Sequence, residues 1–174
     1  MDDQPVGLDH DAPHGERVRG ALTAAGIRVL ENEAVRVGRD GQELWVVGLA
    51  DLWTRRPDPA GALRAVPDGA PVVVLTHSPD VFPTIPARVA LTLAGHTHGG
   101  QVVLPLIGPP IVPSDYGRRY AAGHVVEGGR HLFVTTGIGT SIVPIRLGVP
   151  PEIAVLTLVG SDGATASSGR GGGR

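Results

Sequence analysis

The sequence of 174 residues contains no cysteine. This absence excludes a disulfide framework, and it also excludes any metal site that is built on thiolate ligands. A metal ion in this protein would therefore be bound through histidine nitrogen together with carboxylate or carbonyl oxygen. The lack of cysteine does not by itself decide the redox compartment.

A long apolar run, a basic leader and an excess of positive charge are also missing. The chain has no run of about 18 apolar residues of the kind that spans a bilayer. Its first residues, MDDQPVGLDHD, are acidic and lack the apolar segment of a secretory signal peptide. The net charge of −2 provides none of the basic surface that phosphate-backbone binders use. These features predict a cytoplasmic protein, as the chain is written, and they argue against nucleic acid as a partner.

Glycine and proline are abundant, with 26 and 16 residues respectively. The β-branched runs between them argue against disorder and predict many short strands joined by tight turns. The length is that of one ordinary domain. We expect this domain over residues 1–159, followed by a disordered tail over residues 160–174, where the sequence is of low complexity and rich in glycine and serine.

The pattern of apolar residues predicts a layered α/β arrangement. Residues 15–26 show helical spacing and end at Gly26, which predicts a short amphipathic helix, and a second helix is expected over 58–66 with Asp58 as its cap. A helix that leads into a fully apolar strand is typical of α/β layers. Strands are expected at 27–38, 43–51, 71–80, 88–100, 101–108, 118–137 (with a hairpin turn at Glu127-Gly128-Gly129) and 150–159.

Two of these predicted strands end in loops that carry histidine. One ends in THSPD with His77, and the other ends in GHTHGG with His96 and His98. Functional groups of open α/β sheets gather in loops beyond the carboxyl ends of strands. If residues 96–98 stay extended, His96 and His98 point to one face and can straddle two metal ions about 3.5–4 Å apart. An isolated His-x-His is more often a polar strand end, but the flanking glycines and the third histidine favour a metal site.

These segments resemble the C-terminal part of the calcineurin-like metallophosphoesterases, in particular their bacterial phosphodiesterase branch. THSPD and LTLAGHTHGGQV carry the resemblance, which extends over roughly residues 7–158. It implies a four-layer α/β/β/α sandwich that is truncated at its N-terminus. It also implies two divalent metal ions that activate a bridging water against a phosphate ester. His77 and His96 would bind one ion, and His98 would bind the other.

The resemblance also gives roles to residues near the start of the chain. The family's Gly-Asn-His-Asp/Glu motif corresponds here to GLDHD. In that alignment Asp9 would bind the second metal, His10 would assist the leaving group, and Asp11 would orient His10. The sequence departs from the motif by an extra residue after the glycine and by aspartate in place of asparagine. The alternative is that this stretch is an unrelated or wrongly assigned start.

The family motifs Asp-x-His and Gly-Asp, which supply the first metal site and the bridging carboxylate, are absent from the sequence. Histidine is a neutral ligand, so two divalent ions without carboxylates would repel each other strongly. Asp51 and Asp80 are further candidates, but no motif places them as the bridge. Loss of the first βαβ unit would also expose apolar faces and unpaired edges. The sequence thus fits a truncated gene product, a misassigned start or a chain that a partner completes.

Three interpretations of function follow. The first is a metal-dependent phosphoesterase that hydrolyses phosphomonoesters or phosphodiesters at a dinuclear site and is inactive alone if the first-metal ligands are missing. The second is a non-catalytic fragment or pseudoenzyme. The third is a mononuclear hydrolase whose single ion is bound by the three histidines.

The resemblance leaves the substrate open between a small phosphate ester and a lipid or other envelope component. Metal identity is equally open among Mn, Fe, Zn, Ni and Mg. Arg118, Arg119 and Arg146 are candidates to hold an anionic substrate, although exposed charge is the more usual role of such residues. His124 and His131 are expected to be ordinary strand residues. The resemblance also allows membrane association through an upstream anchor, which the chain as written does not contain.

Overall fold

One mixed sheet organises the part of the chain that the structure describes. The structure is a computed structural model, and it describes residues 11–39 and 41–159. The tail expected at 160–174 lies outside these residues. Within them, six strands are arranged in the order β1-β2-β3-β4-β6-β5. They are β1 (Glu33–Arg39), β2 (Gln42–Gly48), β3 (Val72–Leu75), β4 (Leu91–Ala94), β5 (Gly123–Glu127) and β6 (Arg130–Val134).

The central strands β2, β3, β4 and β6 run parallel, and the edge strands β1 and β5 pair antiparallel with their neighbours. Val72, Val73 and Val74 form an uninterrupted β-branched run that is buried on both faces of the sheet, as a central parallel strand requires. The hairpin predicted between β5 and β6 is confirmed. Gly128 and Gly129 both have positive φ, which the tight turn demands.

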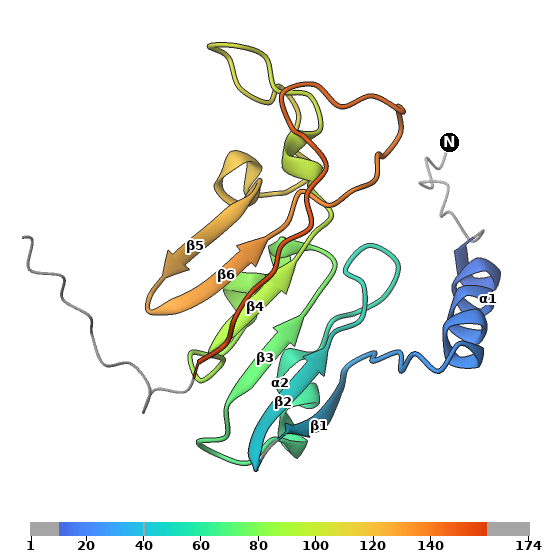
Figure 1. Cartoon of the computed structure of the whole chain (residues 1–174), viewed down its shortest axis with the longest axis vertical. Helices are drawn as coiled ribbons and strands as arrows, with labels where there is room; N and C mark the ends of the chain where they lie inside the picture. The colour runs from blue at the N-terminus through green and yellow to red at the C-terminus, as the bar shows by residue number, and fades with distance from the viewer. Residues whose placement is uncertain (1–10, 40, 160–174) are drawn as a thin grey trace, which may run out of the picture.

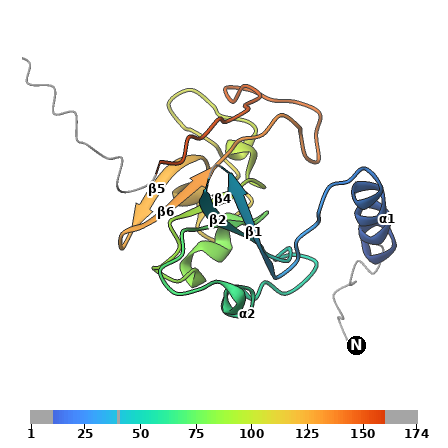
Figure 2. The same ribbon diagram turned by 60° about the horizontal axis from the view of Figure 1, so that its bottom comes forward.

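Short helical segments cover one face of the sheet (Figure 2). They are α2 (Pro59–Ala62), and the 3-10 helices η1 (Leu63–Ala65) and η2 (Pro79–Thr84). Asp58 caps α2 as expected, since its Oδ1 accepts a hydrogen bond of 2.8 Å from the Gly61 N–H. The core beneath these segments is formed by fifteen buried residues, among them Val47, Leu63, Val72, Val74, Phe82, Ile85, Tyr120, Leu132 and Val134.

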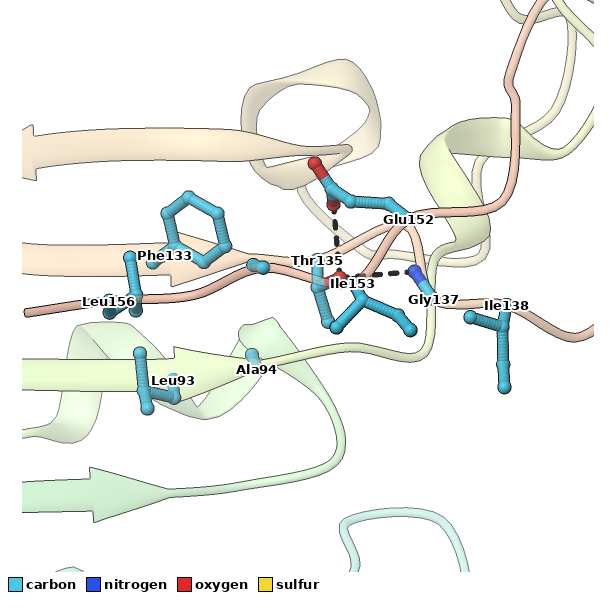
Figure 3. Close-up of a pocket in the computed structure, with 10 residues that line it drawn as sticks. Leu93, Ala94, Phe133, Thr135, Gly137, Ile138, Glu152, Ile153 and Leu156 are labelled. Carbon is cyan, nitrogen blue, oxygen red and sulfur yellow. Dashed lines mark hydrogen bonds between the residues drawn. The ribbon is translucent and has the colours of Figure 1, made fainter.

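The opposite face, called the open face here, carries Val73, Leu93 and Phe133 together with the segment 152–159. This segment runs across β4 towards the other end of the sheet (Figure 1). Between the segment and the strands lies a shallow apolar groove of about 320 Å³, lined in part by Leu93, Phe133 and Leu156 (Figure 3).

Two expected strands are not formed. Residues 101–108 make only isolated bridges, Val102 with Leu147 and Leu104 with Gly108. Residues 150–159 are extended but belong to no strand. Their start is anchored by Glu152, whose side chain accepts hydrogen bonds of 3.0 Å from the Thr135 hydroxyl and the Thr136 N–H. Beyond this point the segment lies on the sheet face, beside Leu93 and Phe133, and pairs with no strand edge, so the β-branched pattern alone does not produce a strand.

The first helix, α1 (Asp11–Ala24), forms where the sequence predicts it. It ends at Gly26 in left-handed conformation, and the Ile27 N–H donates to the Leu22 carbonyl at 2.9 Å, as in a Schellman motif. The helix does not bury an apolar side against the sheet. Val18 is 59% exposed, and α1 lies beside the sheet in both views (Figures 1 and 2). An ion pair between Arg19 and Glu31 connects it to the chain that enters β1.

The mixed α/β class is thus confirmed for the described residues, in which one sheet is covered by helices on one face. Among their helices, none combines the length and the apolar character that a membrane crossing needs.

Because one face of the sheet is covered and the other is open, the same Ile→Val substitution should change the free energy of unfolding by different amounts on the two faces. Ile85 is 2% exposed under the covered face, whereas Ile153 is 83% exposed on the open face. We expect Ile85→Val to lower the free energy of unfolding by about 0.5–1.5 kcal/mol, because it leaves a methyl-sized void. Ile153→Val should change it by less than about 0.5 kcal/mol. Urea denaturation of both variants checks this, and equal losses would show that the open face is packed like the core.

Candidate metal centre

The parallel pairing of β3 and β4 brings two histidine loops to the same edge of the sheet. The ladder continues past the ends of both strands, because the Thr76 N–H donates to the Leu93 carbonyl at 3.0 Å and the Gly95 N–H donates to the His77 carbonyl at 3.1 Å. These bonds place His77 and His96 next to each other. Their rings meet edge to face, with centroids 4.8 Å apart, and His96 Nδ1 lies 3.1 Å from His77 Nε2.

The GHTHGG loop is tightly turned, so the condition under which His96 and His98 would point to one face, an extended segment, is not met. His96 and His98 both have positive φ, at 70° and 50°. Thr97 between them is buried, and its hydroxyl donates to the Ala121 carbonyl at 2.6 Å. Gly100 has to be glycine, since a Cβ there would lie 2.4 Å from Cβ of Pro109. The turn points the two histidines of the motif to different neighbours.

His98 lies against Arg146. Nη2 of Arg146 lies 3.3 Å from His98 Nδ1 and donates to the Thr136 carbonyl at 2.6 Å. Nε of Arg146 donates to the Gly139 carbonyl at 2.8 Å, which fixes the guanidinium in place. Burial, followed by the charge of Arg146, lowers the pKa of His98.

The environment of His96 favours its neutral form. Burial is the largest cause that lowers the pKa of His96, and the neighbouring His77 lowers it further. The carboxylates of Asp51 and Asp80 act in the opposite direction but do not reverse the shift. Neutral imidazole is the form that offers a lone pair to a metal ion. The site is therefore prepared for a cation without first having to lose a proton near neutral pH.

The turn that follows β2 lies beside the two histidine loops and forms a third side of the site. Asp51 Oδ2 accepts hydrogen bonds from the Trp53 N–H at 3.1 Å and from the Thr54 N–H at 2.9 Å. The Trp53 ring lies 5.4 Å from the His96 ring and remains 66% exposed. Among the described residues, Asp51 Oδ1 and His96 Nε2 are buried polar atoms without a hydrogen-bond partner. Asp51 thus holds a turn and also faces the histidine edge.

Comparison with known proteins shows similarity over most of the chain. Phosphodiesterase YaeI of Escherichia coli (strain K12) is 38% identical over 158 residues, which make up 90% of this chain and 55% of that protein. The uncharacterized metallophosphoesterase YkuE of Bacillus subtilis (strain 168) is 36% identical over 152 residues, or 86% of this chain and 53% of that protein. An uncharacterized metallophosphoesterase of Aquifex aeolicus (strain VF5) is 32% identical over 149 residues, or 80% and 53%.

The chain belongs to the metallophosphoesterase family. It spans about half the length of the curated relatives it matches. No family model matches the sequence, and no solved structure matches it. The family expectation drawn from THSPD and GHTHGG is thereby confirmed, and metal dependence of the family follows from the names of these relatives.

The remaining residues that a metallophosphoesterase site would need are not assembled in the described part of the chain. Within it, no group of three or more histidine, cysteine, aspartate or glutamate side chains is placed to hold one ion. Asp9 and His10 lie outside the described residues, and Asp11 is described only as the first residue of α1. Asp80 accepts hydrogen bonds from the Ser114 hydroxyl at 2.5 Å and the Asp115 N–H at 2.8 Å, so it anchors a loop. The roles of all these residues remain predictions.

The three candidate arginines differ in the groups that they contact. Arg118 donates to the Pro109 carbonyl at 3.2 Å, and Arg119 donates to Glu127, so neither faces a site histidine. Of the three arginines, Arg146 alone contacts a site histidine. This contact and that of Trp53 with His96 were not predicted from the sequence. The only available signal for Trp53 was its place just after a buried strand and Asp51.

The environment of His96 can be tested by titrating its imidazole by NMR in the metal-free protein. We expect a pKa below the ordinary value of about 6.5. His77→Ala should raise the pKa of His96, because it removes a neighbouring cationic group and uncovers the ring. Asp51→Asn should lower it further, because it removes a carboxylate that favours the charged form. Shifts of the same sign in both variants would contradict the geometry.

Proposed function

We propose that the complete protein is a metal-dependent phosphoesterase that hydrolyses phosphomonoester or phosphodiester bonds, and that this chain supplies the histidine half of its two-ion site. The observation that carries the proposal is the 3.1 Å separation of His77 Nε2 and His96 Nδ1 at the carboxyl edge of a parallel sheet. Family membership of the chain supports the reaction class.

The histidine pair fits one divalent ion. Two nitrogens bound to the same ion at about 2.1 Å lie about 3.0–3.4 Å apart for angles between a right angle and the tetrahedral angle. The observed separation falls in this range, although it also lets one ring donate an N–H to the other. The orphaned Nε2 of His96 and Oδ1 of Asp51 mark the surroundings as polar and incompletely satisfied. His98, which points elsewhere, is proposed as a ligand of the second ion.

The carboxylates that balance two divalent ions are proposed to come from outside the described residues. Asp9 is the candidate within this chain, and further ones would lie in the half of the relatives that the chain does not match. We infer that the complete domain is a four-layer α/β/β/α sandwich whose second sheet covers the open face. The apolar groove along Leu93 and Phe133 supports this, since such a surface is stabilised by packing against another layer.

The described residues would position the reaction rather than perform its chemistry. Divalent ions at the site supply Lewis acidity toward the phosphate oxygens. His77 and His96 would direct their lone pairs to the same ion. Thr97 fixes the loop between His96 and His98 through its hydrogen bond to the Ala121 carbonyl. Arg146 orients the His98 ring. By the family pattern, His10 would protonate the leaving oxygen and Asp11 would orient His10.

The other two interpretations predict different results. A pseudoenzyme would keep the histidine pair without turnover. A mononuclear site bound by three histidines needs His98 to join the other two rings, whereas His98 contacts Arg146 in the structure. The dinuclear proposal is therefore preferred over the mononuclear one.

The proposal is tested on the complete protein by the hydrolysis of bis(4-nitrophenyl) phosphate in the presence of Mn²⁺. We expect His77→Ala and His96→Ala each to reduce the rate to that of the buffer, because each removes one of the two nitrogens that hold an ion. The double variant His124→Ala/His131→Ala is a matched control. It also removes a histidine pair with nitrogens 2.9 Å apart, but that pair lies on the β5-β6 hairpin. Its rate should equal that of the parent.

Wild-type rates in His77→Ala and His96→Ala would overturn the assignment. Absence of turnover in the complete protein together with stoichiometric Mn²⁺ binding, measured by elemental analysis, would instead favour the pseudoenzyme.

A further inference from the structure

Two loops at the histidine edge carry large aliphatic side chains that face solvent. The first loop comprises residues 102–112, and the second comprises residues 137–147; together they are called the paired loops. Both project beyond the carboxyl ends of the strands, at the top of Figure 1. Their exposed aliphatic residues are Leu106, Ile107 and Ile111 in the first loop, and Ile138, Ile142, Val143, Ile145 and Leu147 in the second.

The paired loops are joined into one unit by a buried glutamine. The side-chain amide of Gln101, which is 8% exposed, donates to the Ser141 carbonyl at 3.1 Å and to the Val143 carbonyl at 2.8 Å. Its oxygen accepts from the Ser141 N–H at 2.6 Å. The backbones also meet, since the Val103 N–H donates to the Leu147 carbonyl at 2.7 Å. The loops are therefore a built platform and not two independent segments.

The tips of the platform are aliphatic where their backbone would favour glycine. Leu106 has a φ of 67° and Ile142 a φ of 64°, a left-handed conformation that glycine adopts without penalty. Both side chains are fully exposed, so they contribute no packing within the chain. Neither the turn nor the core accounts for an aliphatic residue at these positions. A binding role outside the chain does.

The charged side chains near the paired loops indicate which kind of partner would bind there. Residues 102–112 and 137–145 contain no charged side chain. Basic groups lie just below the tips, where Arg118 donates to the Pro109 carbonyl and Arg146 donates to the Gly139 carbonyl. Peripheral proteins enter the boundary between acyl chains and anionic headgroups with apolar side chains, and basic side chains next to these contact the headgroups.

We propose that the paired loops are a docking surface for an anionic lipid bilayer. Leu106 and Ile142 enter the boundary of the acyl chains, and the exposed Arg118 faces the lipid phosphates. A protein interface is the alternative that the test below separates from a bilayer. If the proposed function holds, on which this last step rests, the substrate is an amphiphilic phosphate ester whose headgroup reaches His77 and His96 from the bilayer.

The test is sedimentation of the chain with large unilamellar vesicles of equal parts phosphatidylglycerol and phosphatidylcholine. We expect the parent to bind and Leu106→Ser/Ile142→Ser to lower the partition coefficient by about tenfold or more, since two aliphatic side chains no longer leave water. The matched control is Ile153→Ser/Val155→Ser, which removes two equally apolar residues that are 83% and 89% exposed on the open face. Its binding should equal that of the parent.

The proposal is overturned if the parent does not bind, if the loop variant binds as well as the parent, or if the control loses as much binding as the loop variant. A loop variant that changes the oligomeric state and not vesicle binding would show a protein interface instead. Because sedimentation is measured without metal or substrate, a failure of docking is distinguishable from a failure of the phosphoesterase proposal. Hydrolysis of soluble bis(4-nitrophenyl) phosphate by the loop variant reports on the latter separately.

Discussion

The parallel register of β3 and β4 is the constraint on which the candidate site depends. Two backbone hydrogen bonds continue this register past the ends of the strands, and the second joins the Gly95 N–H to the His77 carbonyl. Residues 19 positions apart in the chain therefore present their imidazoles at the same point of one sheet edge. A slip of the register by one residue would turn each side chain to the other face and separate the pair.

The sheet divides the molecule into two surfaces of different character, and the site lies at the edge between them. Helical segments and Tyr120 cover one face, and the valines of β3 make the sheet rigid beneath them. The other face keeps an apolar groove that only the segment after Glu152 partly fills. The chain spans about half the length of the curated relatives it matches. Under the proposed function, a second sheet would pack on the open face, and the acidic ligands would come from outside the described residues.

The sequence predicted the parts of this arrangement that depend on local pattern. Apolar runs before THSPD and GHTHGG located β3 and β4, and the known behaviour of parallel strands placed their loops together. Sequence patterns do not report long-range contacts, so the sequence did not predict that Arg146, 48 residues away, would contact His98. Nor did it predict the left-handed backbone of His96 and His98. The strand expected at 150–159 fails for the same reason, because β-propensity produces a strand only where the segment pairs with another strand, and this segment pairs with none of the described strands.

The central claim, that His77 and His96 bind one ion beside Trp53, is tested most directly by fluorescence. In a Trp45→Phe background, Trp53 is the remaining tryptophan, and its ring lies 5.4 Å from His96. Titration with Co²⁺ should quench its emission saturably at about one equivalent per chain, as expected for an ion bound within a few ångströms of the indole. His77→Ala should abolish the quenching, and His124→Ala/His131→Ala should preserve it. Unchanged quenching in the His77→Ala variant would contradict the account.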